Sequence, residues 1–220
     1  LVYNFAYLHR HTATTYHIAW VELLVGLGAA IADYIGVGRA TNIREELTDL
    51  VFYLNTMKSL ARASCIDYVM HGGLAIPNPI TANVAKYFYA NNYHHCARIV
   101  EDFCGGIINT MPTYKDWQNK DTHDFIDKYL GGKADVSAEA RLRILDTLRH
   151  YPGLGLEIDV NNIHAEGSLM AERLTIYAEA REDLALYKKV AEVLSGVTKV
   201  SQKEYIKLVQ DLGKLGKGAQ

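Results

Sequence analysis

Three of the chain's nine histidines lie within "LHRHTATTYHIAW", residues 8–20, and imidazole is a common metal ligand. On a helix, His9 and His11 would point about 200° apart, and His9 and His17 would differ by about 80°. Neither pair shares a face closely enough to hold one metal ion, and the segment has no HExxH motif. The spacing therefore favours solvated or core-edge histidines over a metal site.

Two further groups contain residues of types that can bind metals or undergo redox reactions. His94, His95 and Cys96 are adjacent, so on a helix their side chains would fan out by about 100° each, which predicts no metal site. Cys65, Cys96 and Cys104 form no CxxC pair and cannot all pair within one chain. We expect free thiols in a reducing compartment.

The composition is that of an ordinary globular protein, with 220 residues, 49% hydrophobic and 22% charged. The net charge of -2 does not call for nucleic acid or an anionic membrane as a partner. The longest apolar stretch, Ile18 to Ile35, is interrupted by Glu22 and Asp33, so we expect a buried helix rather than a membrane span. No signal peptide is recognised, so we expect a cytoplasmic protein. The apolar start at Leu1 indicates a piece of a longer protein.

Helical periodicity dominates the sequence, and Gly- and Pro-containing segments separate the helical patterns. Asn78 is expected to cap a helix that begins at Pro79, and Ser137 is expected to open another. Alternating β patterns are short and few. The predicted helices cover residues 2–35, 43–71, 79–104, 118–130, 137–151, 168–195 and 201–212. The fold class is all-α, an antiparallel helical bundle.

Three ordered segments carry a resemblance to a known family. They are "FAYLHRHTATTYHIAWVELLVGLGAA", "PNPITANVAKYFYANNYHHCARIVEDFCGGIINTMP" and "IDVNNIHAEGSLMAERLTIY". Together they resemble the C-terminal part of the 4-hydroxybutyryl-CoA dehydratases, which are also vinylacetyl-CoA isomerases, within the larger 4-hydroxyphenylacetate 3-hydroxylase flavoprotein family. The resemblance implies the C-terminal helical domain of an acyl-CoA-dehydrogenase-like fold. We assign residues 1–196 to that domain and 197–220 to a terminal helix and tail.

The iron–sulfur site of the dehydratases is altered in this chain. In the dehydratases, a His and a Cys seven residues later help to hold a [4Fe–4S] cluster. Here the resemblance places His9 at the first position and Tyr16 at the second. The dehydratases' Tyr and Lys positions fall on Ala13 and His17. A neutral phenol is a poor substitute for a thiolate ligand, so we expect no iron–sulfur cluster.

The second catalytic element differs as well. The dehydratases carry a Glu just before "S-I-H", and this chain has Asn161 there, which cannot act as a general base. Glu166 could replace it, or could be a surface carboxylate. His9 and His164 remain as candidate catalytic residues.

The flavin framework is better retained. The resemblance implies that Gly105, Gly106, Asn83, Gly167 and Ser168 contribute to a FAD site shared between subunits. Each has a purely structural alternative. The glycine pair could simply end a helix, the serine could cap the next one, and the asparagine could face water.

These observations leave several functions open. The first is a flavin-dependent dehydratase or isomerase that acts on an acyl-CoA. The second is a FAD-dependent aromatic hydroxylase that acts on a phenol and needs no cluster. The third is a non-catalytic assembly module or degenerate paralogue. We expect a homodimer or homotetramer, no nucleic-acid or membrane partner, and an inactive isolated domain that binds FAD weakly or not at all.

Overall fold

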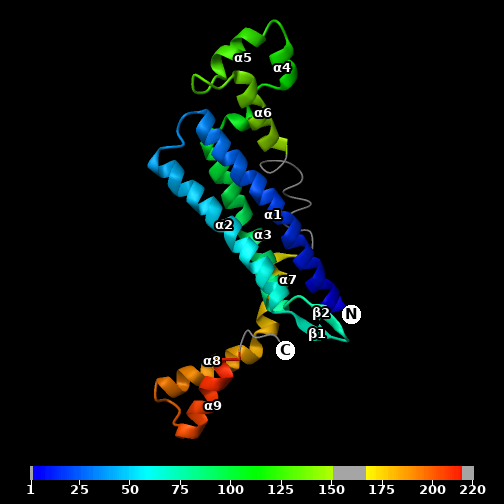
Figure 1. Ribbon diagram of the computed structural model, residues 1–220, viewed down its shortest axis with the longest axis vertical. Helices are drawn as coiled ribbons and strands as arrows, with labels where there is room; N and C mark the ends of the chain where they lie inside the picture. The colour runs from blue at the N-terminus through cyan, green and yellow to red at the C-terminus, as the bar shows by residue number, and fades with distance from the viewer. Residues whose placement is uncertain (1, 151–166, 215–220) are drawn as a thin grey trace. The chain divides into compact units, whose positions relative to one another are not determined.

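A computed structural model describes residues 2–150 and 167–214 of the chain. Figure 1 shows the elements in chain order: α1 (Val2–Tyr34), α2 (Thr41–Ile66), β1 (Val69–His71), β2 (Leu74–Ile76), α3 (Pro79–Phe103), the 3-10 helix η1 (Ile107–Asn109), α4 (Tyr114–Gln118), α5 (His123–Tyr129), α6 (Ala138–Leu148), α7 (Leu169–Glu179), α8 (Arg181–Leu194) and α9 (Gln202–Leu212). The described part is helical apart from one short hairpin, which confirms the predicted all-α class.

The chain divides into two compact units. The first, called here the hairpin unit, contains residues 1–12, 60–87 and 166–220. The second, called the long-helix unit, contains residues 13–59 and 88–165. Helices α1, α2 and α3 each contribute residues to both units, and each unit is described by itself.

The long-helix unit is built around the later part of α1, the first part of α2 and the later part of α3, and these helices lie alongside one another in Figure 1. Gly28 lets them approach closely, because a β-carbon there would lie 3.1 Å from Val100 Cγ2 and 3.5 Å from Leu50 Cδ1. The interior is formed by apolar side chains at helical spacing, as the sequence pattern predicted. They include Val21, Leu24, Leu50, Met57, Val100 and Phe103, all buried.

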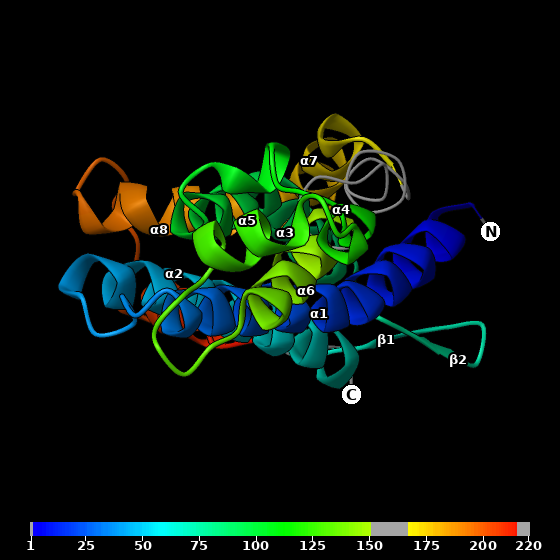
Figure 2. The same ribbon diagram turned by 90° about the horizontal axis from the view of Figure 1, so that it is seen from above.

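The hairpin unit joins the start of α1, the end of α2 and the start of α3 to α7, α8 and α9. Strands β1 and β2 pair in antiparallel fashion, with Val69 opposite Ile76, and Figure 2 shows the two strands side by side. The predicted cap of α3 is confirmed, since the Asn78 side-chain oxygen accepts a hydrogen bond from the Thr81 amide at 3.0 Å.

Three predicted boundaries were wrong. The helix predicted over 43–71 ends at Ile66, because Gly72 and Gly73 adopt φ values of 58° and 82° and form the tight turn of the hairpin. The predicted loop after Met111 contains α4, which Thr113 and Asp116 stabilise with a capping box. The helix predicted over 168–195 is divided into α7 and α8 at Ala180.

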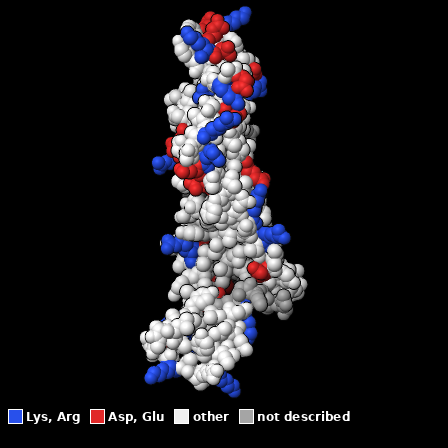
Figure 3. All heavy atoms as spheres, turned by 60° about the vertical axis from the view of Figure 1, so that its left-hand side comes forward, with Lys and Arg blue, Asp and Glu red and all other residues white. Residues whose placement is uncertain are grey.

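Helix α1 is long and apolar enough to cross a membrane, the one described helix of which this is true, and 39% of its most apolar window is buried. Core helices of soluble proteins share these properties. The side chains of Val21, Leu24 and Ala32 on this helix are fully buried, whereas Ala29 is exposed. Figure 3 shows positive and negative side chains interspersed on the face drawn, without a large area of one sign, in keeping with the small net charge.

Candidate functional site

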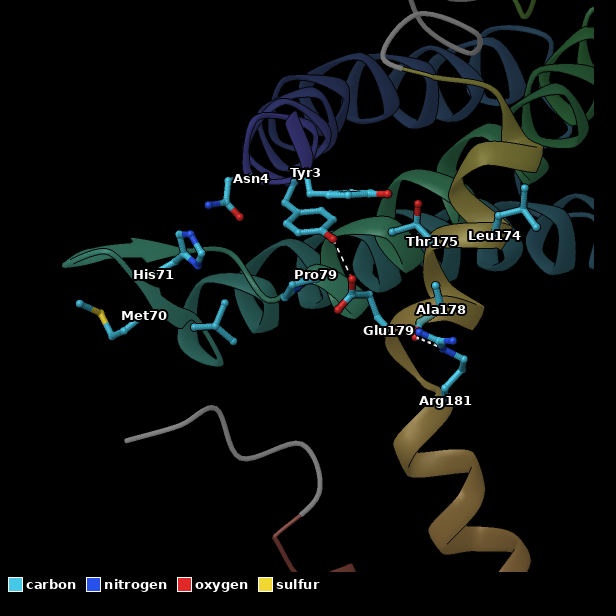
Figure 4. Close-up of a pocket in the computed structure, with 12 residues that line it drawn as sticks. Tyr3, Asn4, Met70, His71, Pro79, Leu174, Thr175, Ala178, Glu179 and Arg181 are labelled. Carbon is cyan, nitrogen blue, oxygen red and sulfur yellow. Dashed lines mark hydrogen bonds between the residues drawn. The ribbon is translucent and has the colours of Figure 1, made fainter. Parts of the chain in front are cut away.

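A cavity of about 660 Å³ lies in the hairpin unit, a size typical of small-molecule sites. Its walls come from the start of α1, strand β1, the first residue of α3, and α7 with the start of α8 (Figure 4). The lining mixes aromatic, apolar and polar side chains: Tyr3, Asn4, Tyr7, Val69, Met70, His71, Pro79, Leu174, Thr175, Ala178, Glu179 and Arg181. The cavity can therefore enclose an apolar or aromatic group and orient it with a few polar contacts.

Tyr7 and Glu179 form a direct polar contact in the cavity wall. The Tyr7 hydroxyl donates to Glu179 Oε1 at 2.8 Å, which joins α1 to the end of α7. Burial and, secondarily, the neighbouring carboxylate hold the pKa of Tyr7 well above its usual value. The phenol is thus a neutral hydrogen-bond donor at physiological pH, and its proton is committed to Glu179.

A buried arginine lies behind the cavity. Arg10 is only 7% exposed, and its Nη1 donates to Asn83 Oδ1 on α3 and, at 3.4 Å, to Thr175 Oγ1 on α7. Asn83 is fully buried, and its amide nitrogen donates to the Pro79 carbonyl at 2.6 Å. Since Thr175 also lines the cavity, Arg10 links the cavity wall to the interior.

Gly167 belongs to the same arrangement. A β-carbon at this position would lie 2.9 Å from Arg10 Nη2, and the residue has a φ of 116°, which side chains other than glycine rarely adopt. The structure therefore joins two of the five predicted cofactor residues, Asn83 and Gly167, through Arg10. Ser168 caps α7, because its hydroxyl accepts from the Ala171 amide at 3.2 Å.

A buried ion pair lies one helical turn further along α3 and one turn nearer the start of α7. Lys86 Nζ is 3.8 Å from Glu172 Oε1, and both side chains are fully buried. Glu172 lies in the first turn of α7, where the helix dipole favours a carboxylate. Helices α3 and α7 are thus joined at two levels. Arg10 bridges Asn83 to Thr175, and one turn away Lys86 pairs directly with Glu172.

The glycine pair lies in the long-helix unit, directly after α3. Gly105 and Gly106 have φ values of 66° and 77°, and β-carbons at either position would meet nothing within 4 Å. The Gly105 amide donates to the Asp102 carbonyl at 3.0 Å, so the pair does end the helix. The turn is also exposed, which leaves its backbone open to a phosphate or a ring. The geometry fits a flavin contact, and that contact remains a prediction.

His9 is exposed and stacks on Phe5, with ring centroids 5.3 Å apart. Seven residues later on α1, Tyr16 is 41% exposed. His17, by contrast, is fully buried and lies parallel to the Tyr89 ring at 4.1 Å. Within residues 2–150 and 167–214, no group of three or more His, Cys, Asp or Glu side chains is placed to hold a metal ion.

Three of the residues singled out from the sequence, His164, Asn161 and Glu166, lie outside the described residues. Sequence reasoning also missed three buried charged residues, Arg10, Lys86 and Glu172. Their signal was weak. Each sits at a core-facing position of an amphipathic helix, where a charged residue is unusual and indicates a buried partner.

Comparison with known proteins bears on this site. The family model described as 4-hydroxyphenylacetate 3-hydroxylase C terminal matches residues 1–195. The 4-hydroxybutyryl-CoA dehydratase/vinylacetyl-CoA-Delta-isomerase of Clostridium aminobutyricum is 23% identical over 208 residues, which cover 90% of this chain and 42% of that protein. The oxygenase component of a 4-nitrophenol 4-monooxygenase/4-nitrocatechol 2-monooxygenase from Rhodococcus opacus is 28% identical over 142 residues, 64% of this chain and 26% of that protein.

Solved structures share the fold. An oxygen-tolerant archaeal 4-hydroxybutyryl-CoA dehydratase from N. maritimus superposes with a TM-score of 0.77 at 27% identity, covering 94% of this chain and 43% of that one. The oxygenase component of 4-hydroxyphenylacetate 3-monooxygenase, solved with FAD and 4-hydroxyphenylacetate, superposes with a TM-score of 0.72 at 19% identity, covering 86% and 40%. The chain thus spans less than half the length of each of these relatives.

Proposed function

Because the chain belongs to the 4-hydroxyphenylacetate 3-hydroxylase C-terminal family, we propose that it forms the C-terminal helical domain, residues 1–196, of a FAD-dependent enzyme. The enzyme acts on an acyl-CoA or a phenol, without an iron–sulfur cluster. The observation that supports this proposal is the contact of Arg10 with Asn83, Thr175 of the cavity wall and the backbone at Gly167, because the resemblance assigns Asn83 and Gly167 to the FAD site.

Within this domain the described residues bind and orient. Arg10 sets the positions of α3 and α7, and with them the cavity wall at Thr175. Tyr7 and Glu179 fix the opposite end of α7 against α1. The exposed Gly105–Gly106 turn is where the backbone would contact FAD. FAD, when bound, supplies electron transfer to or from the substrate or to oxygen.

The acyl-CoA reading is supported by the similarity to the two dehydratases, one of which covers 94% of this chain at 27% identity. The phenol reading is supported by Tyr16, since a hydroxylase needs no cluster ligand at that position and Tyr16 offers only an exposed phenol. Both proposed reactions use the same FAD site, and they differ in the substrate.

A single set of assays separates them. The protein that carries this chain is incubated without oxygen with 4-hydroxybutyryl-CoA, and loss of water is followed by mass spectrometry. In parallel it receives reduced FAD, oxygen and either 4-nitrophenol or 4-hydroxyphenylacetate, and the hydroxylated product is measured. Turnover in one arm assigns the reaction class. A protein that retains no flavin and turns over in neither arm would instead be the non-catalytic assembly module or degenerate paralogue.

A further inference from the structure

A second cluster of reactive side chains lies in the hairpin unit, apart from the residues that line the cavity. His11 on α1 reaches two consecutive residues near the end of α2. Its Nδ1 lies 2.8 Å from Ser64 Oγ, and its Nε2 lies 3.2 Å from Cys65 Sγ. Ser64 is fully buried and His11 is half-buried, whereas Cys65 is exposed. A thiol, a base and a group that orients the base are thus in contact.

The hydrogen bonds of Ser64 allow an arrangement of the His11 protons that suits a base. When the Ser64 hydroxyl donates to the Ala61 carbonyl, at 2.9 Å, it accepts from the Nδ1–H of His11. In the neutral ring, Nε2 then carries a lone pair directed at the Cys65 sulfur, and the thiol S–H can donate to it.

The state of His11 favours this role. Burial lowers the pKa of His11 below its usual value, so the ring is neutral and able to accept a proton at pH 7. Cys65 lies one residue before the end of α2, and His11 is the basic side chain in contact with its sulfur.

The other two thiols of the chain provide a contrast. Cys96 and Cys104 are both buried, and burial raises the pKa of each to about 12. The Cys104 thiol donates to the Val100 carbonyl at 3.2 Å. Reaction with a soluble electrophile needs both access and thiolate character, and these two residues lack both.

We propose that Cys65 is a nucleophilic thiol, activated by His11 and oriented through Ser64, that exchanges with low-molecular-weight disulfides. The thiol proton moves to His11 Nε2 as Cys65 Sγ attacks one sulfur of the disulfide. The disulfide S–S bond breaks, and its electron pair leaves with the second sulfur. His11 returns the proton to that sulfur, so the products are a mixed disulfide on Cys65 and one free small thiol.

The first test compares reaction rates with 5,5′-dithiobis(2-nitrobenzoate) at pH 7. The reference is a synthetic peptide of residues 60–70, which contains Cys65 but no His11. An ordinary thiol is only a few per cent thiolate at this pH, so removal of the proton by His11 during attack should make Cys65 in the native protein about tenfold faster than in the peptide. A native rate at or below the peptide rate would overturn the proposal, and this comparison needs no variant.

Variants assign the effect to His11. We expect His11→Gln to remove the acceleration, while His94→Gln, a change of the same type at an exposed position of α3, retains it. Intact-mass analysis after incubation with glutathione disulfide should show one adduct, located on Cys65 and absent in Cys65→Ser. A folded His11→Gln protein that reacts as fast as the wild type, or an adduct on Cys96 or Cys104 instead, would refute the assignment.

Discussion

Arg10 and Asn83, 73 positions apart in the sequence, meet in the interior of the hairpin unit, where the guanidinium donates to the side-chain oxygen of the amide. Both side chains are buried, at 7% and 0% exposure. This contact joins α1 to α3, and the second contact of Arg10, to Thr175, joins them to α7 and the cavity wall.

Replacement of Arg10 should therefore destabilise the protein strongly. Arg10→Met leaves the buried Asn83 oxygen without its charged donor, and we expect a loss of about 3 kcal/mol in the free energy of unfolding, measured with urea. The control is Arg98→Met, because Arg98 is 77% exposed and pairs with Asp102 on its own helix at 4.0 Å. Arg98→Met should lower the free energy of unfolding by less than about 0.5 kcal/mol. Equal losses in the two variants would contradict the role given to Arg10.

Gly167→Ala tests the close approach to Arg10. The added β-carbon would meet Arg10 Nη2 at 2.9 Å, in a backbone conformation that disfavours alanine. We expect a loss of about 1–3 kcal/mol in the free energy of unfolding. Gly26 is a helical glycine, and a β-carbon there would meet nothing within 4 Å. Gly26→Ala should therefore leave the free energy of unfolding unchanged or raise it. The Gly167→Ala loss should shrink in the Arg10→Met background, and a strictly additive double variant would show that the two residues do not interact.

The ion pair of Lys86 and Glu172 should show strong coupling. Lys86→Met leaves a buried carboxylate without its partner and should cost about 3–5 kcal/mol in the free energy of unfolding. The double variant Lys86→Met/Glu172→Leu removes both charges and should recover most of this loss. A double variant as unstable as the sum of the single ones would mean that the 3.8 Å contact carries no interaction energy.

Alkaline pH should weaken the long-helix unit through its buried thiols. Burial raises the pKa of Cys96 and Cys104 to about 12, whereas in the unfolded chain a thiol ionises near about 8.5. The native state holds these protons longer, so stability is complete below about pH 8.5 and falls as pH rises toward 12. Each thiol contributes a slope of about 1.4 kcal/mol per pH unit in that window. Cys104→Ala should reduce the slope measured by urea unfolding between pH 9 and 11, and an unchanged slope would refute this explanation.

A matched pair of variants tests whether the Gly105–Gly106 turn contacts FAD or only ends the helix. Gly105→Leu places a side chain where we expect FAD to approach, and it should lower the flavin released per chain on denaturation. Gly72→Leu is the matched control, since Gly72 also has a positive φ, 58° against 66°, and also has nothing within 4 Å. Equal flavin in both variants, with both folded, would leave Gly105 as a helix terminator alone.

The sequence predicted the helices well because apolar spacing is a local signal, and Asn78 and Ser137 cap helices as expected. Ser168 also caps a helix, which was the structural alternative to its predicted role at FAD. The hairpin was missed because "VMHGGLAI" is short and its pairing depends on two glycines with positive φ. Site residues proved harder, because a polar side chain does not reveal a distant partner.

Asn83 illustrates this limit. From the sequence it could contact a ligand or face water, yet it is fully buried and bonded to Arg10 and Pro79. Gly167 illustrates it as well, since the close neighbour of its backbone is a guanidinium of the same chain. Contacts across 73 or more positions are fixed by tertiary packing, which no local pattern encodes.

The central claim is that this is the C-terminal domain of a flavin enzyme that carries no iron–sulfur cluster. The most direct measurement is the flavin, iron and acid-labile sulfide content of the anaerobically purified protein that carries this chain. We predict about one FAD per chain and only trace iron, because Tyr16 supplies no thiolate at the position that the resemblance assigns to a cluster ligand of the dehydratases. Stoichiometric iron and sulfide, or a colourless protein without flavin, would contradict the account.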